Sequence, residues 1–346
     1  MELRWAAAAL DRFMQSARGI LVVHHGDADG SSAAALIVKA ADRYNITVVD
    51  TITPKLQPYI TPDVFSSLIN YCDTADSLIS LDLPIHEDQG PLPTLAKTFR
   101  FLAIDHHGDA KLRPLDLSFY GIIHLHSYLL GADKPSTYCA GKLTYDILDT
   151  LGKGDGLAWL GQVSIIGDFG ERDWPSLFEP KPQNYDTLKT ISDTFNWTLY
   201  QPIDNRHCFQ TLARANQPED VIQDPVFMQI HETYKSEIDR VADDFEENHQ
   251  LIAGKLVYEL DSKYPVNSPA SYIAAHRHPD EVVIFFQKME GGYRLEGRNF
   301  SKKVHIGKLL ESLCKGIGSG GGHDFAGGGI VWEQHYNTLI DRLNRI

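Results

Sequence analysis

The sequence is poor in cysteine, and its four cysteines are scattered. Cys72, Cys139, Cys208 and Cys314 lie far apart, and no two of them form a Cys-X-X-Cys pair. This spacing argues against a disulfide framework and against a structural zinc site, and it suits a reducing compartment. We therefore expect a cytoplasmic protein.

A long uninterrupted apolar run is also missing. The N-terminal segment MELRWAAAAL is the best candidate, but Asp11 and Arg12 end it too early for a signal peptide or a membrane span. We expect an amphipathic first helix there. Neither end carries a recognisable lipidation signal, so a membrane is not an expected partner.

Positive charge is in the minority. The chain has 32 Lys and Arg against 46 Asp and Glu, a net charge of −14. Proteins that grip long nucleic acids nonspecifically usually carry a basic excess, because much of their affinity comes from neutralising phosphates. The charge therefore disfavours a long polymer, including long duplex nucleic acid, as the partner. A phosphate-bearing substrate would have to be attracted by local positive charges, and not by the net charge of the chain.

The chain of 346 residues is long enough for two domains, each with its own core. Residues 20–170 alternate short apolar runs with helical patterns, which predicts an α/β domain built on a parallel sheet. The expected strands are ILVV (20–23), ITVV (46–49), LISL (78–81), FLAI (101–104) and GIIHL (121–125), and the expected helices are 31–42, 135–151 and 156–166.

The remaining residues indicate a second, smaller α/β domain. Residues 172–225 are polar and punctuated by proline, with little periodicity, and a charged helix at 226–250 is expected to connect the domains. Beyond it we expect strands at 255–260, 281–289 and 293–300, a hairpin turn at 290–292, a helix at 304–316, a glycine-rich loop at 318–329, and a final strand and helix. The predicted division is 1–200 for a catalytic metal-binding domain, 201–250 for a linker and connector helix, and 251–346 for a substrate-binding domain, with the active site in the cleft between the domains.

Two acid–histidine clusters directly follow predicted strands: HHGDADG at 24–30 and DHHG at 105–108. In parallel sheets, ligands gather at the carboxyl ends of the strands. Carboxylate oxygens mixed with imidazole nitrogens suit a divalent cation bound near phosphate. The two clusters therefore point to a metal-dependent hydrolase.

In the first cluster, Asp27 and Asp29 are two residues apart, so an extended backbone directs both carboxylates to the same side. A divalent cation would relieve their repulsion, and Gly30 would let the chain turn into the next helix. A surface turn with a helix-capping Asp is the simpler alternative. His24 and His25 project to opposite sides, so we expect one metal ligand between them, and the spacing leaves open which one.

The second cluster offers two adjacent histidines, His106 and His107, on a strand-to-loop turn. One could bind metal and the other could contact phosphate or a leaving oxygen, while Asp105 orients either ring. A buried, hydrogen-bonded histidine pair is the alternative. Asp82 in SLDLP and Asp168 in GDFG would each read as a helix cap or surface residue when taken alone.

The glycine-rich segment GSGGGHDFAGGG contains His323 and Phe325 and leads into an apolar strand, which argues against a flexible linker. We expect the backbone N–H groups of Gly320, Gly321 and Gly322 to form an anion-binding nest beside His323. The segment lacks the Gly-Lys-Ser/Thr ending of a P-loop. Arg298 is the expected phosphate contact in a locally cationic stretch that also contains Arg294, Lys302, Lys303 and Lys308.

Taken together, these motifs resemble the DHH phosphoesterase superfamily, specifically its DHH–DHHA1 branch, along nearly the whole chain. The four ordered motifs are HHGDADGSSAA, the strand ending at Asp82, Asp105-His106-His107, and GDFG with Asp168. EGRN and GGGHDFAGG resemble the signature of the DHHA1 module. One departure is the spacing from the first-motif histidine to Asp27, which is one or two residues here and commonly three in the family.

The family contains RecJ-type single-strand exonucleases, nanoRNases, dinucleotide phosphodiesterases and manganese pyrophosphatases. The GGGH segment disfavours the pyrophosphatase branch, and the acidic charge disfavours an added nucleic-acid-binding domain of the RecJ kind. The resemblance therefore implies a phosphodiesterase that hydrolyses short oligonucleotides or linear dinucleotides such as pGpG, and hence a link to cyclic di-GMP turnover. A RecJ-like exonuclease is the alternative, and a non-catalytic nucleotide sensor is a minor one.

The resemblance also implies roles for individual residues. Two divalent cations would share Asp82 as a ligand. Mn²⁺ is the expected ion, and Mg²⁺ and Co²⁺ are the alternatives. His25 (or His24) and Asp27 would complete one site, and Asp29, His106 and Asp168 the other. His107, supported by Asp105, would contact the scissile phosphate. Arg298, Gly320, Gly321, Gly322 and His323 would bind the far end of a short nucleotide substrate.

Overall fold

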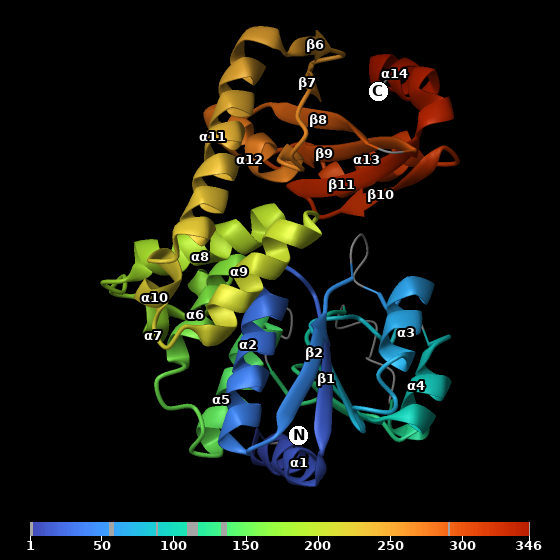
Figure 1. Cartoon of the computed structure of the whole chain (residues 1–346). Coiled ribbons are helices and arrows are strands. Elements are labelled where there is room, and N and C mark those ends of the chain that lie inside the picture. Colours follow the sequence, from blue (N-terminus) through green and yellow to red (C-terminus); the bar gives the residue numbers. More distant parts are fainter. Residues whose placement is uncertain are drawn as a thin grey trace. The chain divides into compact units, whose positions relative to one another are not determined.

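The computed structural model describes residues 3–54, 59–87, 89–108, 117–132, 137–289 and 291–345. The chain divides into two units, Met1–His231 and Glu232–Ile346, and each unit carries its own β-sheet (Figure 1). The division falls within the long helix α11 (Pro225–Asn248), inside the segment 201–250 that was predicted to connect two domains.

The N-terminal unit is built on a five-stranded sheet in the order β2-β1-β3-β4-β5. Every neighbouring pair is parallel, which confirms the predicted fold class. The strands are β1 (Gly19–His24), β2 (Thr47–Ile52), β3 (Ser77–Leu81), β4 (Arg100–Asp105) and β5 (Ile123–His126), each at a predicted apolar run. Because the strands are parallel, their carboxyl ends meet at one edge of the sheet.

Helices cover both faces of this sheet. Along β1, Ile20 and Val22 pack into one core and Leu21 and Val23 into another, as the two-residue period of a strand requires. The first core includes α1 (Leu3–Ser16), α2 (Ala28–Arg43), α5 (Ala140–Thr150) and α6 (Ala158–Gly167), and the second includes α3 (Pro62–Ile69), α4 (Leu92–Thr98) and the 3₁₀ helix η1 (Leu117–Tyr120). Figure 1 shows α2 and α5 on one side of the sheet and α3 and α4 on the other.

The helical predictions for this unit agree with the structure over the described residues. The helix predicted at 135–151 begins at Ala140, and its first two predicted residues, 135 and 136, lie outside the described ranges. The first helix is amphipathic as expected, with Ala6, Leu10 and Phe13 buried. No helix in the described ranges is both long and apolar enough to cross a membrane.

Residues 172–225, whose sequence shows little periodicity, are largely helical. This segment forms η3 (Glu171–Asp173), α7 (Pro175–Phe178), α8 (Tyr185–Thr198), α9 (Pro202–Arg214) and α10 (Pro218–Ile222). The prolines begin helices instead of ending them: Pro175, Pro202 and Pro218 each occupy a first helical turn, where the missing N–H group has no intrahelical partner. The pattern of α8 is also helical, since Leu188, Ile191 and Phe195 are all buried.

The C-terminal unit holds a six-stranded sheet in the order β10-β11-β9-β8-β7-β6. β7 and β8 are parallel, and the other neighbouring strands are antiparallel. The elements are β6 (Gln250–Ile252), β7 (Lys255–Leu260), α12 (Asn267–Arg277), β8 (Val282–Met289), β9 (Gly292–Arg298), α13 (Ile306–Cys314), β10 (Gly318–Gly322), β11 (Ala326–Trp332), η4 (Glu333–His335) and α14 (Tyr336–Arg345). Met289 pairs with Gly292, as the predicted hairpin requires, and Glu290 of that turn lies outside the described residues.

The glycine-rich segment is not the loop that we expected. It forms an antiparallel hairpin of β10 and β11, with Gly320 opposite Gly329, so its backbone follows a strand ladder instead of converging on an anion. The glycines make room for close packing. A Cβ on Gly320 would lie 2.8 Å from the carbonyl oxygen of Leu310 in α13, and a Cβ on Gly307 would lie 2.1 Å from the carbonyl oxygen of Gly322.

This packing predicts that Gly320→Ala destabilises the protein, by about 1–3 kcal/mol, because the added methyl group would overpack the contact with α13. Gly321→Ala is the matched control, since a Cβ there would meet no described atom within 4 Å. Thermal and urea unfolding of both variants check the prediction. Equal stability of the two variants would contradict the proposed role of the glycines.

Candidate metal centre

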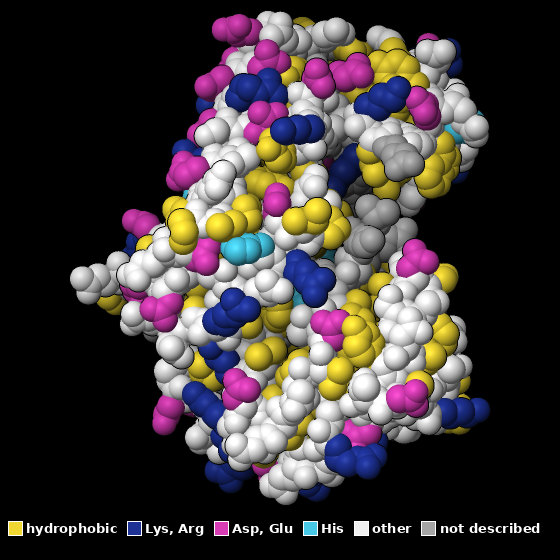
Figure 2. Space-filling model, viewed as in Figure 1, with side chains coloured by type: hydrophobic (Ala, Val, Ile, Leu, Met, Phe, Trp, Pro, Cys, Tyr) yellow, Lys and Arg dark blue, Asp and Glu magenta, His cyan; other side chains and the backbone are white. Residues whose placement is uncertain are grey.

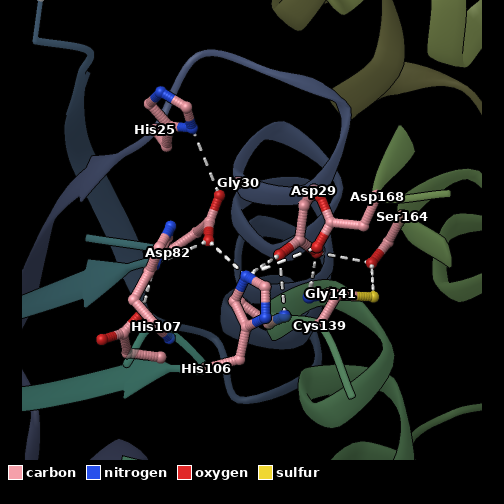
Figure 3. Close-up of polar contacts among 12 residues, drawn as sticks. His25, Asp29, Gly30, Asp82, His106, His107, Cys139, Gly141, Ser164 and Asp168 are labelled. Atoms are coloured by element: carbon pink, nitrogen blue, oxygen red, sulfur yellow. Dashed lines mark hydrogen bonds and ion pairs between the residues drawn. The ribbon is translucent and has the colours of Figure 1, made fainter. Parts of the chain in front are cut away.

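The carboxyl edge of the N-terminal sheet gathers the predicted acidic and histidine residues of that unit. β1 ends at His24 and leads through His25 and Asp27 into α2, which begins at Ala28 and carries Asp29 in its first turn. β3 ends just before Asp82, β4 ends at Asp105, and Asp168 caps the carboxyl end of α6. Figure 3 shows side chains from these separate elements turned toward one another.

The first group of possible metal ligands is His25, Asp27 and Asp82. His25 Nδ1 lies 2.7 Å from Asp27 Oδ2 and 3.4 Å from Asp82 Oδ2. The other oxygen of Asp27 accepts a hydrogen bond from Gly30 N at 2.9 Å, so the carboxylate caps α2 while it faces His25. Helix capping and metal binding, which the sequence posed as alternatives for Asp27, are therefore compatible.

The second group is Asp29, His106 and Asp168. His106 Nε2 lies 3.6 Å from Asp29 Oδ2 and 3.4 Å from Asp168 Oδ2. It also lies 3.2 Å from Asp82 Oδ1. Asp82 thus presents one oxygen to each group, between His25 and His106 (Figure 3).

Asp82 adopts a left-handed backbone conformation, with φ of 56°. Aspartate tolerates this conformation better than most residues, yet it is uncommon and costs free energy. Residues held this way cluster at functional sites. The conformation places a buried carboxylate, 1% exposed, directly after β3.

Asp29 is fixed by the amino end of α5. Its Oδ2 accepts a hydrogen bond from Ala140 N at 2.8 Å, and its Oδ1 accepts hydrogen bonds from Gly141 N at 2.7 Å and Ser164 Oγ at 2.5 Å. The free N–H groups of a helix start favour such a negative charge. Sequence reasoning missed Ser164, although a serine inside the apolar helix GLAWLGQVSII was the available signal.

The carboxylates of the site carry an excess of negative charge, which favours the binding of a cation. Burial, reinforced by the nearby charges of Asp82 and Asp168, raises the pKa of Asp29 well above its ordinary value. Burial also raises the pKa of Asp168, to about 7. Asp82 Oδ1 and Asp168 Oδ2 are buried and accept no hydrogen bond from the described residues. Oxygen-rich groups completed by single imidazoles fit Mn²⁺ or Mg²⁺.

His24 and His25 have different surroundings. His24 is buried; its Nδ1 donates a hydrogen bond to the His25 carbonyl at 2.7 Å, and its Nε2 lies 3.2 Å from Thr53 Oγ1. Its ring packs against Phe209, and burial lowers its pKa to about 4. The structure therefore places His25, and not His24, among the carboxylates.

His107 is held by Asp105. Asp105 Oδ1 accepts hydrogen bonds from the His107 ring at 2.8 Å and from its backbone N–H at 3.2 Å. Burial alone would lower the pKa of His107, but the Asp105 carboxylate outweighs it and raises that pKa. The His107 side chain is 35% exposed, whereas that of His106 is 10% exposed. The structure thus turns His106 toward the carboxylates and leaves His107 accessible.

In the C-terminal unit, the structure brings Arg298 and the glycine-rich hairpin together. Arg298 pairs with Ala326 across β9 and β11, and His323 lies in the hairpin turn with an exposed side chain. Arg298 Nη2 donates a hydrogen bond to Ser268 Oγ at 2.8 Å, while its buried Nε has no hydrogen-bond partner among the described residues. Arg298 therefore keeps a donor that a ligand could use.

Arg298 Nη2 lies 3.6 Å from Glu296 Oε2, and three of the other four cations of this stretch also face carboxylates. Arg294 lies 3.2 Å from Glu296, Lys302 lies 3.1 Å from Asp324, and Lys303 lies 2.9 Å from Asp280. On the face drawn in Figure 2, Lys and Arg side chains are scattered among Asp and Glu, without a continuous basic stripe over the described residues. Most of the local positive charge is thus compensated within the unit.

We expect the chelator-treated protein to lose stability as the pH rises from about 5 to about 8, because the loss begins above the unfolded pKa of aspartate and is complete above the folded pKa of Asp168. Because burial raises the pKa of Asp168 to about 7, while an unfolded aspartate titrates near ~3.9, the folded state holds a proton that the unfolded state has released. Stability is then present at low pH and is lost as the pH rises through the folded pKa. The raised pKa values of His25 and His106, where carboxylates outweigh the effect of burial, act in the same direction.

Thermal unfolding at both pH values, with chelator and with saturating Mn²⁺, checks this prediction. Mn²⁺ should raise the unfolding temperature more at the higher pH, because the ion takes the place of the bound protons. Asp168→Asn should reduce the pH dependence. An unfolding temperature that is equal at the two pH values in chelator would contradict the prediction.

Comparison with known proteins identifies a domain in the C-terminal unit and similar folds for the chain as a whole. A family model described as the DHHA1 domain matches residues 241–346. No curated protein matches the chain by sequence. Among solved structures, RecJ of Thermus thermophilus, in complex with Mn²⁺, matches with a TM-score of 0.70 and 16% identity, over 99% of this chain and 54% of RecJ.

Two further structures cover both units. The DHH domain of a protein described as a member of a family of ribosomal proteins matches with a TM-score of 0.75 and 15% identity, over 99% of this chain and 89% of that one. PggH of Vibrio cholerae, described as a pGpG-specific phosphodiesterase, matches with a TM-score of 0.51 and 14% identity, over 95% of this chain and 99% of PggH. Residues 241–346 are thus a DHHA1 domain, and the chain as a whole shares its fold with these solved structures.

Proposed function

We propose that this chain is a divalent-metal-dependent phosphodiesterase that hydrolyses short oligonucleotides or linear dinucleotides, such as pGpG, to mononucleotides. The observation that carries the proposal is the shared position of Asp82, whose two oxygens face two separate groups of aspartate and histidine. Two cations held by one shared carboxylate are typical of enzymes that cleave phosphate esters by in-line displacement.

The described residues divide into two cation sites. His25, Asp27 and Asp82 would hold one ion, and Asp29, Asp82, His106 and Asp168 the other. When bound, the ions would supply Lewis-acid stabilisation of phosphoryl oxygens and lower the pKa of a water molecule. Mn²⁺ is the preferred ion, with Mg²⁺ or Co²⁺ as substitutes.

His107 would bind the scissile phosphate. The Asp105 carboxylate raises the pKa of His107, which favours the protonated ring, and that ring can donate an N–H to a phosphate oxygen or to the leaving oxygen. Asp105 holds the ring by accepting the Nδ1–H hydrogen bond, which leaves Nε2 as the donor toward substrate. His107 is thus a catalytic residue, and Asp105 acts through it as a positioning residue.

The C-terminal unit would bind the far end of the substrate. Arg298 has an unused Nε donor, and the exposed side chain of His323 stands in the adjacent hairpin turn. A protonated or charged donor paired with a phosphate contributes about 1.5–3 kcal/mol. Because Arg294, Lys302 and Lys303 already face carboxylates, little positive charge remains to bind a longer strand.

A RecJ-like single-strand exonuclease is the second candidate. It is favoured by the fold similarity to RecJ, whose TM-score of 0.70 exceeds the 0.51 for PggH. A nucleotide sensor without activity is a weaker candidate, because such a protein needs no complete ligand set, and here both groups keep all their carboxylates.

Replacing the shared carboxylate should abolish most of the activity. Asp82→Asn preserves the shape of the side chain and suits the left-handed backbone at this position. We expect kcat for pGpG in Mn²⁺ to fall at least about a hundredfold, because a metal ion stabilises the transition state by several kcal/mol and about 1.4 kcal/mol corresponds to a factor of ten.

Asp76→Asn is the matched control at the other end of β3. Asp76 accepts hydrogen bonds from Arg18 and Gly19, so this variant should lose stability but keep its activity per folded molecule. Full turnover by a folded Asp82→Asn protein would refute the shared-carboxylate assignment.

Substrate length separates the two enzymatic candidates. We expect kcat/KM to be highest for substrates of about two to five nucleotides, and long-strand affinity to show a shallow salt dependence, because few phosphates are neutralised. The measurement compares a dinucleotide, a five-nucleotide and a twenty-nucleotide substrate at fixed salt. A steady rise of kcat/KM with length would instead support the RecJ-like exonuclease.

A further inference from the structure

A second histidine cluster lies next to the DHH motif and shares only Asp105 with the residues assigned to hydrolysis. It consists of His86, Asp105 and His124. His86 lies in the turn that follows β3, Asp105 ends β4, and His124 lies in β5 opposite Ala103. Because side chains two residues apart share a face of a strand, His124 and Asp105 lie on the same face of the sheet.

That face is the one covered by α3 and α4, since Ala103 belongs to the core that contains those helices. The side chains there are buried: His86 is 7% exposed, His124 6% and Asp105 0%. One ligand atom from each residue lies within 4.8 Å of the others. Three metal-binding side chains from three different segments therefore converge in the interior of the N-terminal unit.

The main evidence for a metal site in this cluster is the second carboxylate oxygen of Asp105. Oδ1 is used by His107, but the buried Oδ2 and the buried Nδ1 of His86 have no hydrogen-bond partner among the described residues. These two atoms lie 3.5 Å apart, which is too long for a good hydrogen bond. Burying a carboxylate oxygen without a hydrogen-bond donor costs free energy. A cation bound between Asp105 Oδ2 and His86 Nδ1 would offset this cost.

The separation of His86 and Asp105 resembles that of His106 and Asp168, which face a common centre and are 3.4 Å apart. Two ligands of a tetrahedral zinc ion are about 3.3 Å apart, given bond lengths near 2.0–2.1 Å.

We propose that His86, Asp105 and His124 form a third metal site, which binds zinc and is distinct from the two cation sites around Asp82. Two imidazoles and one carboxylate are a donor set that zinc accepts, with a fourth position left for water. The groups around Asp82 are richer in oxygen and suit harder ions. The two kinds of site are therefore selective for different metals.

His126 is excluded as a ligand although its ring lies 6.0 Å from that of His86. Its Nε2 donates a hydrogen bond to the His107 carbonyl at 2.8 Å, and its Nδ1 accepts one from Tyr128 N at 3.0 Å. Both ring nitrogens are thus occupied. His126 is a buried histidine of the same strand as His124, which makes it a matched control.

A zinc ion at this site would restrain the Asp105 carboxylate through Oδ2. One oxygen of the carboxylate would bind the ion while the other keeps its hydrogen bond to His107. The orientation of His107 would then depend on a metal that takes no part in the chemistry itself. Ligand orientation by an outer partner is a common feature of metal enzymes.

The test counts zinc in the full-length chain, without any measurement of hydrolysis. The background variant carries Asp82→Asn and Asp168→Asn, which leaves the first group with His25 and Asp27 and the second with Asp29 and His106. The protein is stripped with chelator, reloaded with Zn²⁺, dialysed and analysed by elemental mass spectrometry. We expect one zinc per chain in the background, none after the further change His86→Gln or His124→Gln, and one after His126→Gln.

Co²⁺ loading gives a second readout that does not depend on histidine variants being folded. The background protein loaded with Co²⁺ should show the intense visible absorption of a four-coordinate ion. A background protein that retains no zinc and shows no such absorption would overturn the proposal. Zinc that persists in both the His86→Gln and His124→Gln proteins would overturn it as well. Because no step measures hydrolysis, failure here leaves the proposed phosphodiesterase activity to be judged by its own experiments.

Discussion

Mutual repulsion among buried carboxylates is the constraint on which the N-terminal unit depends. The buried Asp29 and Asp82 and the partly buried Asp168 meet at one edge of a parallel sheet, where little water screens their charges. The protein offsets part of this repulsion with backbone amides at the start of α5 and with the imidazoles of His25 and His106. Divalent cations would offset the rest, so the feature that destabilises the unit is also the one suited to bind metal.

The histidines at this edge differ in burial and in their interaction partners, and therefore in their proposed roles. The buried ring of His24 packs against Phe209, and its two nitrogens contact the His25 carbonyl and Thr53 Oγ1. His106 faces three carboxylates. His107 stays accessible and is held by Asp105. The second oxygen of Asp105 points toward His86 on the α3–α4 side of the sheet. One aspartate therefore links the candidate catalytic edge to a histidine cluster in the interior.

In the C-terminal unit, packing explains most of the glycine-rich segment. Gly307 and Gly320 allow α13 to lie against the β10–β11 hairpin at a distance that a side chain would prevent. The hairpin in turn brings its His323 turn beside Arg298, on the neighbouring strand β9. The glycines thus position the residues proposed to bind substrate through close backbone packing, and not by wrapping an anion themselves.

The sequence by itself determined the parallel sheet and the set of acidic and histidine residues at its edge. The two-residue period of the strands and the placement of acids directly after them are local signals, and they predicted which residues meet. Tertiary structure decided what the local pattern left open. It placed His25 among the carboxylates and not His24, folded 172–225 into helices, turned the glycine segment into a hairpin, and brought His86 to Asp105 and His124. These outcomes depend on which surfaces pack together, and contacts between segments far apart in the chain leave no signal in the spacing of neighbouring residues.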